Sequence, residues 1–272
     1  MLVAQIPVAR AANMPRVACL EWASAELVVS LGIQPVAVAD LKGYRDWVVA
    51  PRLSDDCLDL GSRGEPNLEV LLKLNPDMIV SAHGYGLEGG PFAKIAPLHT
   101  VALYDGTGGT PYGQAESETL RLAERLGRQT QAHEVIESTA ATISRTKKML
   151  ADQGGSPLAV VSMFDDRHVR VYGRSSLFQD VLDRLGLINA WTGETGSWGF
   201  STMGIEELVA IGNARLISLD PIPPHVKIRI EQSTLWKSLP CVRAGNVTTI
   251  PPVWPFGGLA AAARFATLLA QT

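Results

Sequence analysis

Short apolar runs separated by turn residues predict a parallel α/β architecture for the first half of the chain. Four runs have the length of buried strands, namely residues 17–20, 35–39, 78–82 and 101–104. Amphipathic stretches lie between them and stop at Gly or Pro, as short helices do, at residues 23–31, 68–74 and 92–95. Strands that alternate with short helices indicate a mainly parallel sheet.

The same alternation restarts in the second half. Strands are expected at residues 158–163, 216–219 and 247–250, and helices at 176–185, 205–211, 235–239 and 258–269. The segment 67–81 aligns without gaps with 204–218: each has Glu at its third position (Glu69, Glu206), an apolar helix, a break and a strand that ends in Ser. The repeated pattern predicts two related α/β lobes.

A long amphipathic segment separates the two halves. From Thr130 to about Gln153 the chain has no Gly or Pro, and apolar residues recur with helical spacing. A helix of this length spans roughly 35 Å. It is either a strut between lobes or an ordinary surface helix, and the two flanking halves favour the strut. The predicted division is a tail (1–14), an N-terminal lobe (15–128), the connecting helix (129–154) and a C-terminal lobe (155–272).

Composition narrows the class of protein. Of the 272 residues, 46% are hydrophobic and 19% charged, which is typical of a soluble globular protein, and the net charge of −3 gives no reason to expect nucleic acid as a partner. No apolar run is long enough to span a membrane. Cys19, Cys57 and Cys241 have no metal-site or disulfide spacing and are expected to be buried. The first fourteen residues fit either a trimmed export signal or a cytoplasmic start.

Two motifs suggest chemistry but fit poorly. The segment Gly84–Gly89 has the G-x-G-x-x-G spacing of a nucleotide-binding loop, but Pro91 places the next helix too late for its last glycine to pack inside that helix. We therefore interpret it as a loop at the carboxyl end of a strand. His83, His168 and His225 fall near predicted strand ends, where they could converge on zinc, although single histidines are more often plain loop residues.

Tryptophan is the informative residue. Five of the six tryptophans fall at predicted strand ends or in loops of both halves: Trp22, Trp47, Trp191, Trp198 and Trp254. A single Trp usually fills a core, but five at such positions predict an aromatic wall that faces a cleft between the lobes. Such a wall suits a large, partly apolar ligand.

Two polar side chains could orient that ligand. Arg63 lies in a glycine-flanked turn, where its guanidinium could hold a pair of anionic oxygens or simply pair with Glu65. Tyr85 lies between two glycines, and its phenol could reach the same point or remain an exposed loop aromatic. Glu69 and Glu206 both lie in first helical turns, where the helix dipole alone favours a carboxylate, or they could form one acidic knob per lobe for a basic partner.

The Trp-centred motifs Val17–Trp22, Tyr44–Trp47, Arg63–Glu69, Ser81–Gly86, Asn189–Thr195 and Pro252–Trp254 resemble the ferric hydroxamate (ferrichrome-type) siderophore-binding proteins of bacterial ABC importers. The resemblance covers nearly the whole chain from Arg16 onward. It implies two α/β lobes joined by one long helix, and a monomer that works in the periplasm. The chain departs from the family pattern at Val80, His83, Phe200 and Phe256. These departures bear on which hydroxamate the protein prefers.

The resemblance also implies roles for the candidate residues. Arg63 and Tyr85 contact the iron-bound hydroxamate oxygens, the five tryptophans with Phe256 line the pocket, and Glu69 and Glu206 dock on arginines of the inner-membrane permease. The ligand is an Fe(III)–siderophore complex with no direct metal ligand from the protein, so we expect a transport protein and not an enzyme. The alternatives are a receptor for haem, cobalamin or zinc, and a nucleotide-dependent α/β enzyme using the Gly84 loop.

Overall fold

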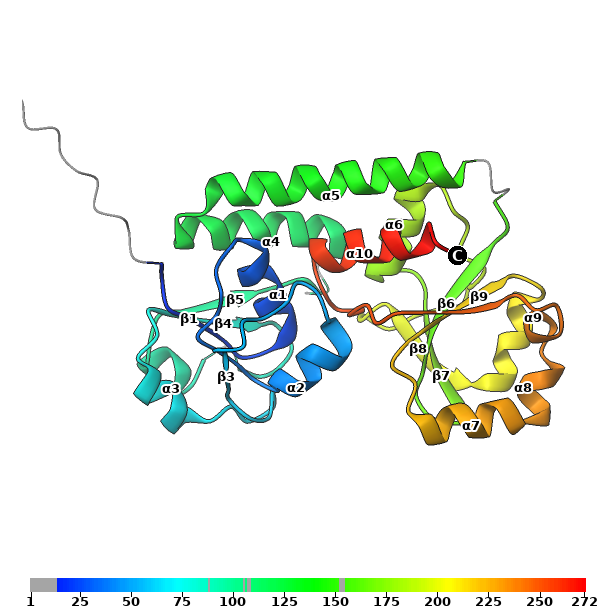
Figure 1. Cartoon of the computed structure of the whole chain (residues 1–272), viewed down its shortest axis with the longest axis horizontal. Coiled ribbons are helices and arrows are strands. Elements are labelled where there is room, and N and C mark those ends of the chain that lie inside the picture. Colours follow the sequence, from blue (N-terminus) through cyan, green and yellow to red (C-terminus); the bar gives the residue numbers. More distant parts are fainter. Residues whose placement is uncertain (1–13, 88, 105, 107–108, 152–154) are drawn as a thin grey trace, which may run out of the picture.

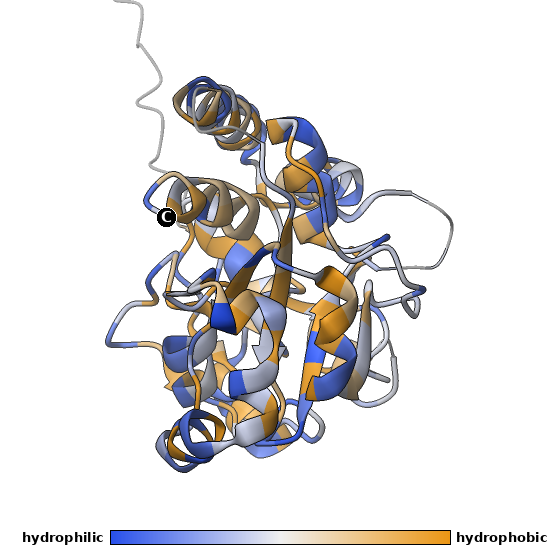
Figure 2. Cartoon of the chain, turned by 90° about the vertical axis from the view of Figure 1, so that its right-hand side faces the viewer, coloured by the Kyte–Doolittle hydropathy of each residue, from blue (hydrophilic) through white to orange (hydrophobic). Residues whose placement is uncertain are grey.

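Two α/β lobes lie side by side beneath one long helix in the computed structural model (Figure 1). The structure describes residues 14–272 except 88, 105, 107–108 and 152–154. Helix α5 (Gln129–Leu150) runs along both lobes with 22 residues, a length of roughly 33 Å. It begins one residue earlier than expected, and the end predicted for it lies partly outside the described residues. Seen end-on, it carries both hydrophobic and hydrophilic residues (Figure 2).

Each lobe is built on a five-stranded sheet with the same order of strands. The N-terminal order is β3-β2-β1-β4-β5 and the C-terminal order is β8-β7-β6-β9-β10. The N-terminal strands are all parallel: β1 (Val17–Cys19), β2 (Ala37–Val38), β3 (Leu58–Asp59), β4 (Met78–Ala82) and β5 (Leu98–Val101). The C-terminal strands are β6 (Leu158–Met163), β7 (His168–Tyr172), β8 (Phe200–Gly204), β9 (Arg215–Leu219) and β10 (Val247–Ile250), with β7 antiparallel to both of its neighbours.

The expected repeat coincides with these elements residue for residue. Its ungapped alignment matches α3 (Leu68–Leu74) with the 3-10 helix η3 (Ile205–Ile211), and β4 with β9. Both strands occupy the same place in their sheets, next to the first strand of the lobe. The internal repeat is therefore structural. The predicted domain boundaries themselves stay a prediction.

Several elements differ from the expectation. The antiparallel strands β7 and β8 were not expected, nor was α4 (Pro111–Leu126), which Thr110 and Pro111 begin and Gly127 ends with a positive φ. Strand β5 ends at Val101 where a strand was expected to begin, and the helix expected at 92–95 is one 3-10 turn, η2 (Phe92–Lys94). Between the strands expected at 35–39 and 78–82, the structure also contains α2 (Leu41–Gly43) and a π-helix, η1 (Tyr44–Val48).

One hydrophobic core runs through both lobes and the helices above them. It joins α1 (Trp22–Ser30), α4, α5, α6 (Leu177–Leu185) and α10 (Leu259–Leu269) with residues of both sheets, including Val17 of β1 and Val160 of β6. The remaining helices cover the C-terminal sheet at the far end: α7 (Pro224–Gln232), α8 (Thr234–Ser238) and α9 (Pro240–Arg243). The three cysteines are buried, as expected.

Polar contacts also tie the lobes together. The carboxylate of Glu26, on α1, accepts hydrogen bonds from the backbone of Gly258 (2.8 Å) and Ala261 (3.1 Å) at the start of α10. The backbone N–H of Tyr112 on α4 donates to Asp180 on α6 at 2.8 Å. The lobes are thus held by a continuous core and by capped helices as well as by α5. No helix in the described part of the chain is long and apolar enough to cross a membrane.

Candidate functional site

A cavity of about 260 Å³ lies between the two lobes. Trp47 of the N-terminal lobe forms one side. The C-terminal lobe supplies the other walls from β6, β7 and the segment after β10, namely Ser162, Met163, Phe164, Arg170, Tyr172, Leu219, Asp220, Val253, Trp254, Pro255 and Phe256. A largely apolar and aromatic wall with a few polar groups is typical of small-molecule sites.

Arg63 forms a cluster with three aromatic rings at the N-terminal side. Its guanidinium carbon lies 3.5 Å from the centre of the Trp22 ring, 5.5 Å from that of Trp254 and 5.8 Å from that of Tyr85. Trp22 and Trp254 meet edge to face with centroids 4.6 Å apart. Cation–π contacts of this kind fix a guanidinium without using its N–H groups.

Asp40 and Glu21 set the position and electrostatics of this cluster. Asp40 has a positive φ of 54°, accepts the indole N–H of Trp22 through its carbonyl (3.0 Å), and places its carboxylate 3.6 Å from Nε of Arg63. Glu21 is buried where it caps α1, and burial raises its pKa. Arg63 lowers the same pKa, so the two charges attract each other.

Arg63 keeps a donor unused. Its Nη1 is buried, and no partner for it occurs among the residues that the structure describes. Tyr85 is half-buried beside it, and burial raises its pKa to about 12, so the phenol stays protonated at neutral pH. Arg63 lowers the same pKa, so the two side chains lie close together. Both are hydrogen-bond donors, and donors of this kind suit an anionic chelate oxygen.

A second group of rings continues from Trp254 across the cleft. Phe256 lies 5.2 Å from Trp254 and 5.4 Å from Trp198, and Trp198 stacks on Tyr104 at 5.5 Å. Trp198 comes from the C-terminal lobe, yet its ring meets Tyr85 of the N-terminal lobe at 6.4 Å. Tyr104 donates to the carbonyl of Pro255 at 2.9 Å, which fixes the segment carrying Trp254 and Phe256.

The structure therefore brings together seven of the eight expected ligand-binding residues: Arg63, Tyr85, Trp22, Trp47, Trp198, Trp254 and Phe256. Trp191 is the exception. It packs against the outer core of the C-terminal lobe and lines a separate surface pocket with Arg174 and Asn189. Asn189 holds the Trp191 backbone N–H at 2.9 Å, so the loop turns this indole away from the ring series. The expectation that Trp191 faces the shared cleft is not met.

Two further expectations about the tryptophans are corrected. Trp22 is the first residue of α1 and Trp47 lies in the π-helix η1, so neither is a loop residue. Sequence reasoning also did not assign several residues that the structure adds to the wall: Tyr104, Phe164, Arg170, Tyr172 and Phe200. Arg170 and Tyr172 of β7 could have been found from the sequence, because residues 168–172 alternate between polar and apolar or aromatic side chains as a half-buried strand does.

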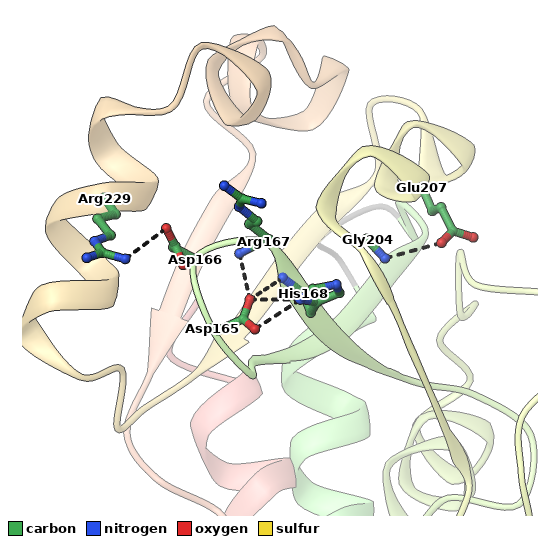
Figure 3. Close-up of polar contacts among 7 residues, drawn as sticks. All are labelled: Asp165, Asp166, Arg167, His168, Gly204, Glu207 and Arg229. Atoms are coloured by element: carbon green, nitrogen blue, oxygen red, sulfur yellow. Dashed lines mark hydrogen bonds and ion pairs between the residues drawn. The ribbon is translucent and has the colours of Figure 1, made fainter.

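The histidines do not converge. His168 is the first residue of β7. Its Nδ1 contacts the carboxylate of Asp165 at 2.9 Å, and its backbone N–H donates to the same group (Figure 3). Asp165 thus bonds within its own turn, to the backbone of Arg167 and His168. Within the described residues, no group of three His, Cys, Asp or Glu side chains has a geometry that could hold a metal ion.

Glu69 and Glu206 occupy equivalent places on the two lobes. Both are exposed and lie in the first turns of the matched helices α3 and η3. The neighbouring Glu207 accepts the backbone N–H of Gly204 at 3.2 Å (Figure 3), so capping of η3 does not need Glu206. Neither Glu69 nor Glu206 takes part in an ion pair among the residues described.

The fold and this interlobe site define a class of binding protein, and comparison with known proteins agrees. The model of the periplasmic binding protein family matches residues 17–253, so the chain belongs to that family. It is similar to the iron(3+)-hydroxamate-binding protein FhuD of Escherichia coli K12, with 35% identity over 261 residues that cover 96% of this chain and 88% of the relative.

Solved structures of siderophore-binding proteins have the same fold. The crystal structure of FhuD from Vibrio cholerae with bound Fe3+–Desferal matches with a TM-score of 0.89 and 29% identity, over 95% of this chain and 97% of that one. The triscatecholate siderophore-binding protein FeuA of Bacillus subtilis shares the fold, with a TM-score of 0.74 at 17% identity over 94% of this chain and 90% of that one.

Proposed function

We propose that this protein is the solute-binding component of an ABC importer and binds iron(III)–hydroxamate siderophores between its lobes. The observation that carries the proposal is the buried, unpartnered Nη1 of Arg63 beside the protonated phenol of Tyr85, next to Trp254 of the cavity wall. Both nearby relatives are named for iron–hydroxamate or Desferal binding, which supports the same ligand class.

The proposed roles follow from the chemistry of the chelate. Hydroxamate oxygens carry negative charge and remain accessible at the surface of the complex, so Arg63 and Tyr85 donate hydrogen bonds to them. The carbon skeleton packs against Trp22, Trp47, Trp198, Trp254 and Phe256, which contribute apolar contact area. The iron is cargo, and the siderophore supplies its ligands. The chain therefore needs no metal-binding residue of its own.

The packing of the lobes supports a small closure on binding. Large hinge motions need a few residues that absorb the change in backbone dihedral angles. Here the lobes share one core, α5 runs unbroken along both of them, and Glu26 joins α1 to α10. We therefore propose that ligand entry is accompanied by local movement of rings such as Trp198 and by a small rotation of the lobes.

Delivery of the ligand needs a partner in the membrane. We propose that Glu69 and Glu206, one on each lobe, contact basic residues of the permease, because both carboxylates are exposed and lie at equivalent positions of the repeat. The same role implies a monomer in the periplasm. The proposal assigns no catalytic activity to the chain.

One titration tests the function against its alternatives. Intrinsic tryptophan fluorescence of the full chain is measured with ferrichrome, iron(III)–desferrioxamine B, ferric enterobactin, ferric citrate, haem, cobalamin and zinc. Saturable quenching by the two ferric hydroxamates at micromolar or lower concentration is the expected result. Tighter binding of haem, cobalamin, zinc or a catecholate would contradict it, and a shift of Tm by NAD or ATP would support the enzyme alternative.

A further inference from the structure

Arg170 lines the interlobe cavity from the C-terminal lobe. It lies on β7, where Val169 and Val171 point into the outer core and Arg170 and Tyr172 line the cavity. Across the strand pair it is in register with Ser162 of β6, which lines the same cavity. The alternation of a strand thus places this guanidinium on the ligand side of the sheet.

Two phenyl rings hold the guanidinium of Arg170 in place. Its guanidinium carbon lies 4.9 Å from the centre of Phe200 and 5.2 Å from the centre of Phe164. Nε is buried, and no described residue accepts a hydrogen bond from it. The ion pairs among the described residues do not include Arg170. A cation that is partly withdrawn from water and has no counter-ion is costly unless a ligand supplies one.

The polar groups described around Arg170 do not form an ion pair with it. Asp220 lines the same cavity, but its carboxylate accepts the backbone N–H of Ile222 at 3.3 Å and forms no ion pair with Arg170. The hydroxyl groups of Ser162 and Tyr172 bond to each other at 3.0 Å. The cavity wall around Arg170 thus offers two aromatic rings, hydroxyl groups that bond to each other, and one carboxylate, Asp220, that forms no ion pair with it.

The two arginines address different parts of a bound molecule. Arg63 lies 5.5 Å from Trp254, Phe256 follows at 5.2 Å, and Phe200 at 5.8 Å from Phe256 leads to Arg170. Three rings thus separate the two cations. An iron(III) trihydroxamate core is neutral, because three hydroxamate charges balance the ferric ion, so the core itself does not call for a second cation.

We propose that Arg170, held between Phe164 and Phe200, forms a specificity-determining subsite for a carboxylate on the periphery of the ferric hydroxamate. This proposal rests on the function proposed above. It means that the protein prefers chelates with an anionic substituent over neutral or cationic chelates that have the same iron core.

The test uses three chelates that differ only in their terminal group. Iron(III)–desferrioxamine B ends in an ammonium, its N-acetyl derivative is neutral, and its N-succinyl derivative ends in a carboxylate. Dissociation constants are measured by tryptophan quenching at low ionic strength. We expect the wild type to bind the succinyl chelate about tenfold more tightly than the acetyl chelate, the effect of one hydrogen bond between charged groups.

Variants assign the preference to one side chain. Arg170→Met removes the charge and keeps the length, and we expect it to bind the succinyl and acetyl chelates equally. Arg170→Lys keeps the charge and should retain a reduced preference. Arg167→Met is the matched control, because Arg167 is exposed in the adjacent turn and its backbone N–H donates to Asp165 (Figure 3). It should keep the full preference, and thermal unfolding confirms that each variant is folded.

The outcomes separate this proposal from the function on which it rests. Equal affinity of the wild type for the three chelates overturns the carboxylate subsite and leaves the proposed function intact. Equal weakening of all three chelates by Arg170→Met also overturns it, because it indicates a packing role. Failure of all three chelates to bind the wild type overturns the proposed function and the subsite with it.

Discussion

The guanidinium carbon of Arg63 lies 3.5 Å from the centre of the Trp22 indole. This stack covers one face of the ring, and Nη1 of Arg63 is buried. Asp40 fixes both partners, since its carbonyl accepts the Trp22 N–H and its carboxylate lies beside Nε of Arg63. The contacts with Trp22 and Asp40 therefore hold the arginine side chain in one position, which lowers the entropic cost of ligand binding.

Removing this arginine should weaken ligand binding. For Arg63→Met we expect the affinity for iron(III)–desferrioxamine B to fall by about 1.5–3 kcal/mol, the size of a hydrogen bond to a charged group. Fluorescence titration measures the loss. Arg45→Met is the control, because Arg45 is exposed on η1 and its nearest carboxylate, on Asp55, is 3.6 Å away. Equal affinity of Arg63→Met and the wild type would remove Arg63 from the site.

The glycine loop allows a comparison of two neighbouring glycines. Gly84 and Gly86 both have positive φ, 88° and 71°, so Ala at either position costs about 1–2 kcal/mol of stability. A Cβ on Gly84 would also lie 2.9 Å from Cζ2 of Trp198, whereas a Cβ on Gly86 meets no atom within 4 Å. We expect similar losses in thermal unfolding, with weaker ferric hydroxamate binding for Gly84→Ala alone. Equal affinities of the two variants would show that the Trp198 contact does not shape the site.

Glu26 makes the stability of the protein depend on pH. Burial raises its pKa from 4.5 to about 7, although the backbone N–H groups of Ala261 and Gly258 lower it. The folded state therefore binds more protons than the unfolded state between about pH 4.5 and 7, so stability falls as the pH rises through this window. Above about pH 7, Glu26 is ionised in both states, and the folded state carries the full free-energy cost of its buried charge.

We expect Glu26→Gln to remove this dependence. The amide oxygen can still accept from Gly258 and Ala261, and it carries no charge to desolvate. At about 1.4 kcal/mol per pKa unit, the free energy of unfolding of the variant relative to wild type should rise by on the order of 3 kcal/mol from pH 4.5 to pH 8. Urea unfolding across this range measures it, with the exposed Glu124→Gln as control. Parallel pH profiles of wild type and Glu26→Gln would contradict the assignment.

Charge reversal tests the proposed docking surface. Glu69→Lys and Glu206→Lys should reduce siderophore-dependent iron uptake by about tenfold or more, because like charges across an interface cost several kcal/mol, while the affinity for the chelate stays unchanged. Uptake of radioactive iron is measured in cells that carry the matching permease. Glu134→Lys is the control, since Glu134 is exposed on α5 at the opposite edge of the molecule from α3 (Figure 1). Unimpaired uptake by both variants would exclude this surface.

Much of the fold follows from local patterns in the sequence. The repeat of α3–β4 in η3–β9 is visible without gaps, because a helix, a break and a buried strand leave the same spacing of apolar residues in both lobes. The start of α5 is also local, since Gly127 ends the preceding helix and the next run lacks Gly and Pro. The sequence also contains the start and stop signals of α4, namely Thr110, Pro111 and Gly127, although no helix was expected there.

The site depended on tertiary structure. Trp191 and Trp198 belong to one loop and have the same side chain, yet only Trp198 joins the ring series across the cleft. Arg170 lies on a strand whose alternation shows which residues share a face, but that pattern does not say which face meets the cavity. Local sequence determines helices and strands because their hydrogen bonds and apolar spacing are local. Which side chains meet depends on how the two lobes pack against α5 and α10, and that packing joins residues as far apart as Trp22 and Trp254.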